Sequence, residues 1–353
     1  MKRYRIDIFD RAFNFVDMGQ TSDPTLIIDY LVQSASSVIV PKKLTASKGN
    51  YIQVRDDTGQ MFQGIVTDYA YDGKTTTITM SQMSKLLDVD VFADVTTLPD
   101  GIESWMRAQL RSVYAGTDAS QALTGLTFSG IYSTAGAYPA TNDGIYNLYD
   151  LAVYFFKVYG VIIDISFSVS ARTVTFSFRK VDTINVWKIE TKLADVADWS
   201  VNASSVNEYP NKMVIRNEAD PTEELTYYWH PNGFSGTVDT DGTQNRVLPV
   251  VSRCALIGVD EEDTFENASY VEAVSQMYQS QFDDQIEITF NTSSRLVEVG
   301  QLGQCYSVID GSTVYNTVLT GYQRLNDKYT RMTFGYVRTR LTQILQQERR
   351  RNQ

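Results

Sequence analysis

The chain carries few of the residue types from which catalytic sites are built. It has one histidine, His230, which lies in the segment YWHPNG at residues 228–233, where a strand is expected to run into a turn. Histidine is the commonest general base near neutral pH, and a hydrolase also needs a nucleophile and a group that orients the base. A role in the turn is therefore a simpler interpretation of His230 than catalysis.

Nucleophile and phosphate motifs are also missing from the sequence. The segment GFSG at residues 233–236 has the wrong spacing for a G-x-S-x-G nucleophile elbow, and neither H-E-x-x-H nor a phosphate-binding glycine loop occurs. A glycosidase with two carboxylates stays open, because its acid and base need not be close in sequence. We predict that the chain has no catalytic residues and is not an enzyme.

Metal and cofactor sites are not indicated either. The densest acidic run, residues 260–263 (DEED), lacks the alternating ligands and central glycine of a calcium loop. A solvated loop and helix start is the favoured interpretation, with calcium binding as the alternative. Cys254 and Cys305 are too few for a disulfide framework or a zinc site. We expect no cofactor and no metal.

Composition and charge limit the partners. With 353 residues, 43% of them hydrophobic, the chain is long enough for two to four folded domains. It carries 31 Lys and Arg against 42 Asp and Glu, a net charge of −11, which disfavours nonspecific binding to nucleic acid. The most apolar stretch, residues 151–167, is interrupted by Lys157 and Asp164 and is too short to span a membrane.

The most informative feature is an internal repeat. Residues 51–80 and 305–334 share one alternating pattern with tight-turn residues at the same places. Its expected core positions are Val54, Phe62, Val66, Tyr69 and Ile78 in the first copy, and Val308, Tyr315, Leu319, Tyr322 and Met332 in the second. Any two antiparallel meanders look somewhat alike, so chance similarity is the alternative. A true duplication would let an oligomer present twice as many equivalent units as it has subunits.

The elements around the repeat predict an α+β fold that is predominantly β. Two similar antiparallel β-barrels are expected, with a helix-plus-hairpin module between them and a helical insertion in the second half. Asp100 and Glu103 have the spacing of a capping box at the start of the first helix, and Gly160 ends the second. The predicted segments are 1–95 (first barrel), 96–185 (module), 186–255 with 296–340 (second barrel), 256–295 (insertion) and 341–353 (C-terminal helix).

Four motifs, in this order along the chain, resemble the tail hub proteins of bacteriophages. They are GNYIQV at 49–54, QGIV at 63–66, YPNKMVI at 209–215 and MTFGYVRTRLT at 332–342. The family includes baseplate hubs and the hub part of type VI secretion spikes. The resemblance implies a homotrimer in which three subunits with two barrels each form a ring of six.

A hub of this kind implies a place and partners for the chain. It would lie at the tail tip of the virion after assembly in the bacterial cytoplasm. There it would join the sixfold tail tube to a threefold tip, contact tail tube, fibre or receptor-binding proteins, and form part of the DNA exit channel without binding DNA specifically.

Two alternatives to this function are open. The chain could be the N-terminal hub portion of a tail-associated cell-wall hydrolase. It could instead be a carbohydrate-binding β-sandwich adhesin, with Trp187, Trp199 and Trp229 as stacking platforms, although aromatic strand residues more often lie in cores and interfaces.

Overall fold

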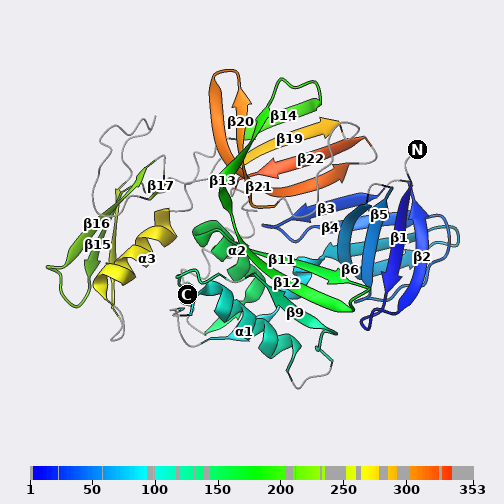
Figure 1. Cartoon of the computed structure of the whole chain (residues 1–353), viewed down its shortest axis with the longest axis horizontal. Coiled ribbons are helices and arrows are strands. Elements are labelled where there is room, and N and C mark those ends of the chain that lie inside the picture. Colours follow the sequence, from blue (N-terminus) through cyan, green and yellow to red (C-terminus); the bar gives the residue numbers. More distant parts are fainter. Residues whose placement is uncertain are drawn as a thin grey trace.

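The protein is mostly β-structure, as the computed structural model in Figure 1 shows. The structure describes residues 3–22, 24–57, 59–93, 98, 100–116, 120–130, 132–138, 144–202, 210, 212–230, 233–234, 252–259, 264–277, 285–291, 302–325 and 328–335. Within them, three α-helices accompany large, mainly antiparallel sheets. The predicted fold class, α+β and predominantly β, is therefore confirmed.

A single 13-stranded sheet runs through the molecule in the order β14-β19-β22-β21-β3-β4-β7-β6-β5-β1-β2, with β13 and β20 branching from β21. Its strands form two units. The first strand unit contains β1 (Tyr4–Phe9), β2 (Phe15–Thr21), β3 (Thr25–Asp29), β4 (Ala35–Val40), β5 (Tyr51–Asp56), β6 (Gly59–Tyr71) and β7 (Thr76–Gln82). The second strand unit contains β13 (Asp182–Glu190), β14 (Val196–Asn202), β19 (Gln285–Asn291), β20 (Gln304–Asp310), β21 (Thr313–Leu325) and β22 (Tyr329–Phe334).

Each strand unit has its own apolar core, because alternate residues of its strands point inward. In β7 the alternation is complete, with every second residue from Thr76 to Gln82 buried. Large, fully buried side chains of the first core include Tyr4 and Phe62, and those of the second include Tyr306, Phe290 and Phe334.

The segment between the units forms a module that lies below the second unit and to the left of the first in Figure 1. It follows a short 3-10 helix, Met83–Leu87, and contains β8 (Asp90–Phe92), α1 (Ile102–Tyr114), β9 (Leu126–Ser129), β10 (Ile145–Asn147), α2 (Leu148–Tyr159), β11 (Val161–Ser168) and β12 (Thr173–Lys180). The two helices and the β11–β12 hairpin were predicted. The parallel pairing of β9 with β12 was not, since β9 is a short strand from a polar, glycine-rich stretch.

The two helices of the module begin differently. The Asn147 side chain caps α2 by accepting hydrogen bonds from the N–H groups of Tyr149 and Asp150, and Gly160 ends the helix at φ 65°. The predicted capping box at α1 is not formed, because Gly101 occupies the N-cap. Glu103 is instead fully buried and accepts hydrogen bonds from Thr134.

A further small sheet lies at the left of Figure 1 and packs against α3 (Phe265–Met277). Its strands are β15 (Lys212–Asn217), β16 (Glu224–His230), β17 (Gly233–Phe234) and β18 (Ser252–Ile257).

The observed sheets differ from the expected segments in two places. Strands β15, β16 and β17 and residues 252–255 of β18 were assigned to the second barrel but form this separate sheet, and residues 285–291 were assigned to the helical insertion but form β19 of the large sheet. Alternation identifies a strand but does not tell which sheet the strand joins.

Two expectations fall where the structure does not describe the chain. The predicted C-terminal helix at 341–353 and the acidic run at 260–263 lie outside the described residues. Among the helices that are described, none is both long and apolar enough to cross a membrane.

Candidate assembly interface

The repeat predicted from sequence has the same strand pairing in both copies. Val54 faces Phe62 in the first copy, and Val308 faces Tyr315 in the second. The next pair of strands agrees as well: Tyr69 faces Ile78, and Tyr322 faces Met332 at the matched position.

Even the irregularities of the long middle strands coincide. β6 has a register shift between Val66 and Asp68, and β21 has one between Leu319 and Gly321, four residues that occupy matched positions. β-Bulges are specific features of a strand pair, so a shared bulge is stronger support for equivalence than shared alternation alone.

Most of the expected core positions of the repeat are buried. Side chains that are no more than 8% exposed are Val54, Phe62, Val66, Ile78, Val308, Leu319, Tyr322 and Met332. Tyr315 is half-buried against the second core. Tyr69 differs from the expectation, because its side chain is 46% exposed although its counterpart Tyr322 is 8% exposed.

The different exposure of these two tyrosines follows from the strand beside each of them. Residues 321–325 of β21 pair on one side with β22 and on the other with β3 of the first unit, which joins the two units into one sheet. The matched residues 68–71 of β6 pair with β7, and no other described strand lies along their second edge. Tyr69 therefore lies on an open edge, whereas Tyr322 lies on a covered one.

Side chains reinforce the covered junction between the units. Arg324, on β21, is 5% exposed and donates a hydrogen bond from Nη2 to the Tyr4 hydroxyl of β1 at 3.0 Å. Just after β3, the Tyr30 hydroxyl accepts a hydrogen bond from the N–H of Ile163 in β11 at 2.9 Å, which links this end of β3 to the module. Burial raises the pKa of Tyr30 and of Tyr322, so both hydroxyls stay protonated over the physiological pH range.

Arg324 and Tyr30 were not identified as junction residues from the sequence. Arg324 follows an alternating apolar pattern, where a charge is normally assigned to the solvent face. The available signal was its position in the repeat, because the matched residue in the first copy, Tyr71, is aromatic.

No arrangement for catalysis or metal binding is found in the described part of the chain. Its histidine, cysteine and carboxylate side chains form no cluster of three or more that could hold a metal ion. The side chain of His230 lies outside what the structure describes. Cys305 is buried and Cys254 is exposed.

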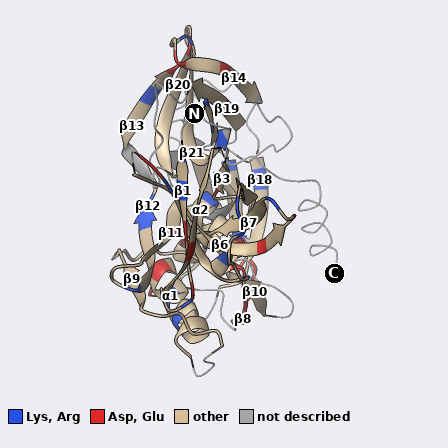
Figure 2. Cartoon of the chain, turned by 90° about the vertical axis from the view of Figure 1, so that its right-hand side faces the viewer, with Lys and Arg blue, Asp and Glu red and all other residues tan. Residues whose placement is uncertain are grey.

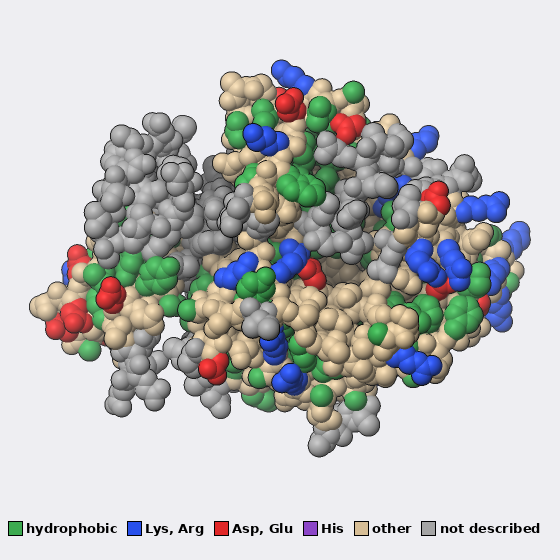
Figure 3. All heavy atoms as spheres, viewed as in Figure 1, with side chains coloured by type: hydrophobic (Ala, Val, Ile, Leu, Met, Phe, Trp, Pro, Cys, Tyr) green, Lys and Arg blue, Asp and Glu red, His purple; other side chains and the backbone are tan. Residues whose placement is uncertain are grey.

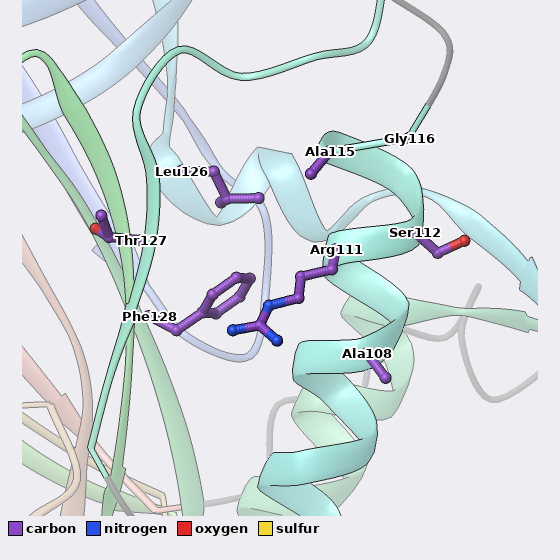
Figure 4. Close-up of a pocket in the computed structure, with 8 residues that line it drawn as sticks. All are labelled: Ala108, Arg111, Ser112, Ala115, Gly116, Leu126, Thr127 and Phe128. Carbon is purple, nitrogen blue, oxygen red and sulfur yellow. The ribbon is translucent and has the colours of Figure 1, made fainter.

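An open pocket of about 910 Å³ lies between α1 and β9 (Figure 4). Arg111 reaches across it from α1, with its guanidinium carbon 5.2 Å from the centre of the Phe128 ring. Ser112 and Thr127 add two hydroxyls, and the remaining lining residues are Ala108, Ala115, Gly116 and Leu126. Because this lining holds neither a base nor a carboxylate, it does not provide the groups of a hydrolytic site.

Charge is distributed unevenly over the surface. Basic side chains gather over the first unit at the right of Figure 3, and acidic ones over the small β15–β16 sheet at the left. The acidic end includes Glu218, Asp220, Glu223 and Glu224, all exposed. On the side shown in Figure 2, basic and acidic residues are interspersed. The described residues drawn in Figures 2 and 3 form no continuous basic track of the kind that binds a phosphate backbone.

No protein-family model and no curated protein matches this sequence. Several solved structures share its fold. A tail protein from Neisseria meningitidis MC58 is 11% identical with a TM-score of 0.53, over 94% of this chain and 96% of that one. The 43 kDa tail protein of prophage MuSo2 from Shewanella oneidensis is 11% identical with a TM-score of 0.55, over 94% and 98% of the two chains.

A third structure agrees with these two. The prophage tail protein gp18 from Listeria monocytogenes EGD-e is 12% identical with a TM-score of 0.56, and the alignment covers 99% of each chain. The match therefore includes both strand units and the segments between them. The chain has the fold of these phage tail proteins, as the order of its sequence motifs implied.

Proposed function

We propose that this chain is a structural hub protein at the distal end of a bacteriophage tail. Three copies form a closed ring, and their six strand units join the sixfold tail tube to the tail tip or host-attachment device. The observation that carries the proposal is the pair of strand units with matching registers, together with a fold shared along nearly the whole chain with phage tail proteins.

The duplication supports the ring because of its symmetry. A subunit with two equivalent units can present six similar surfaces in a trimer, so it can match a sixfold partner on one side and a threefold partner on the other. Within a single chain, β3 of the first unit pairs with β21 of the second. In the proposed ring this pairing supplies three of the six junctions between units. The remaining junction type has to form between subunits.

The charge of the chain supports a role as part of the DNA exit channel. A net charge of −11 gives no general attraction for the phosphate backbone. DNA can therefore pass without being held, and no specific binding of DNA is proposed.

The adhesin alternative has less support from the described tryptophans. Trp187 is 45% exposed, but its ring packs edge-on against Tyr306, with centroids 5.6 Å apart. Trp199 packs against the second core. The two side chains come from different strands and pack within the second unit, as aromatic strand residues ordinarily do.

Antibody labelling of virions tests the proposed position of the chain. Antibodies against the chain, applied to virions from the host that encodes it, should mark the distal end of the tail in electron micrographs. Label on the capsid, or absence of the chain from purified virions, would contradict it. A zymogram on bacterial cell walls and a glycan array with the pure chain test the hydrolase and adhesin alternatives, and both are expected to show no signal.

A further inference from the structure

We propose that the open edge of β6, residues 68–71, binds β14 of a second copy of this chain as an added antiparallel strand. The inference rests on the hub function proposed above and adds the two strands that would close the ring. Its starting point is the matched edge of β21, which β3 already covers within the chain.

Two matched residue pairs show how pairing with β3 changes the exposure of side chains on β21. Tyr322 and Arg324 on β21 are 8% and 5% exposed. Their counterparts on β6, Tyr69 and Tyr71, are 46% and 43% exposed. The members of each pair face matched residues of β7 and β22, so backbone register does not explain the difference. The difference in exposure is explained by β3, which lies along the edge of β21, while no described strand lies along the matched edge of β6.

β14 is the strand that corresponds to β3. In the first unit the order is β3-β4-β7, and in the second it is β14-β19-β22. Thr25 of β3 and Ser200 of β14 occupy equivalent positions, because the β4 residue that Thr25 faces and the β19 residue that Ser200 faces pair with matched residues of β7 and β22. The next residues along the two strands, Leu26 and Val201, therefore correspond as well. Leu26 faces Arg324 within the chain. Val201 of one copy should therefore face Tyr71 of the next.

Both strands have an edge available for this contact. β14 ends the strand order of the large sheet and pairs only with β19 in the part of the chain that is described. An open strand edge presents unpaired N–H and C=O groups, which an added strand satisfies. The contact would also cover two exposed tyrosines, a residue type enriched at protein interfaces.

The proposed contact has the geometry that a ring needs. It joins two different surfaces, β6 of one copy and β14 of the next, and is therefore heterologous. Repetition of a heterologous contact closes a ring when the rotation between subunits allows it. β3 and β21 already make the equivalent contact inside each chain. A ring of three copies would therefore contain six similar strand junctions, three within chains and three between them, in alternation.

Hydrogen exchange on the unmodified protein tests the pairing without a mutation. Successive N–H groups of a strand point to opposite edges, so only the amides of residues 68–71 that point away from β7 would gain a partner. These amides should exchange at least tenfold more slowly in assembled tails than in the isolated chain. The matched amides of residues 321–325 serve as the control, since β3 covers them in both states. Equal exchange of residues 68–71 in the two states would overturn the inference.

Cysteine cross-linking identifies the occupant of the edge. Tyr71→Cys with Val201→Cys, in a Cys254→Ser background, should give disulfide-linked dimers and trimers of this chain on mild oxidation of assembled tails. Directly paired antiparallel residues have Cα atoms about 5 Å apart, within the range of a disulfide. Tyr71→Cys with Ser200→Cys is the matched control and should link poorly, because neighbouring strand residues point to opposite faces.

The outcomes separate this inference from the hub function. Three copies at the tail end without linkage, and with residues 68–71 unprotected, would overturn the β6–β14 contact and leave the hub function standing. Protection of residues 68–71 without linkage between copies would show that another tail protein covers the edge, which also overturns the inference. Absence of the chain from the tail would overturn the hub function itself.

Discussion

Arg324 of the second strand unit donates a hydrogen bond to the hydroxyl of Tyr4 in the first strand unit, at 3.0 Å and with both side chains buried. The two residues are 320 positions apart. The contact lies at the junction where β3 and β21 join the two units, so these units are held by side chains as well as by strand pairing.

A double-mutant cycle measures this link. Arg324→Met and Tyr4→Phe, each alone and combined, should give a coupling of about 1–2 kcal/mol in the free energy of unfolding, because a buried hydrogen bond to a charged group is worth more than an exposed one. Denaturant unfolding gives the four values. The exposed pair Arg216 and Glu224 is the control and should couple by about 0.5 kcal/mol or less. Equal coupling in the two cycles would contradict this account of the junction.

The hydroxyl groups of two buried tyrosines should respond in opposite ways to removal. Tyr30→Phe takes an acceptor from the N–H of Ile163 and should cost about 1–3 kcal/mol. The Tyr322 hydroxyl is buried and has no hydrogen-bond partner among the described residues, so Tyr322→Phe should be neutral or stabilising. Thermal unfolding of the isolated chain compares the two variants. A larger loss of stability from Tyr322→Phe than from Tyr30→Phe would show that these hydroxyls are assigned wrongly.

The buried carboxylate of Glu103 should make Thr134 important for stability. Glu103 is fully buried and accepts hydrogen bonds from the Thr134 N–H at 2.8 Å and hydroxyl at 2.6 Å. Thr134→Val removes the hydroxyl donor and should cost about 1.5–3 kcal/mol in denaturant unfolding. Ser133→Ala, at the exposed neighbouring position, should change stability by less than about 0.5 kcal/mol. The prediction fails when the two substitutions cost the same.

Lys157 should give the stability a pH dependence on the alkaline side. Burial in α2 lowers the pKa of Lys157 to about 8, below the value near 10.5 that it has in the unfolded chain. Below pH 8 the folded state holds a charge that burial disfavours, and this cost declines as pH rises from 8 to 10.5. Lys157→Met should therefore raise Tm at pH 7 and by less at pH 10. A gain that grows with pH would contradict the assigned burial.

The sequence was sufficient for the repeat and for most helices and strands. Tight-turn residues and period-two alternation predicted the two three-stranded meanders, and Gly160 marked the end of α2. These signals are local, because each element carries its own turn and face pattern. The resemblance to phage tail hub proteins agreed with the solved structures because it used motifs in order along the whole chain.

Long-range pairing could not be predicted in the same way. Nothing in residues 212–257 distinguishes a strand of the small sheet from a strand of the large one, and the register of β3 on β21 joins segments about 300 residues apart. The exposure of Tyr69 was missed for the same reason. Alternation predicted that its side chain points inward, but whether a neighbouring strand covers the edge depends on the assembled sheet.

A cryo-electron microscopy reconstruction of the tail tip would show whether three copies form the proposed ring. We expect three copies whose six strand units surround a channel roughly 20 Å wide, enough for duplex DNA, with few Lys and Arg side chains on its lining. One, two or six copies, or a channel ringed by basic side chains, would contradict it.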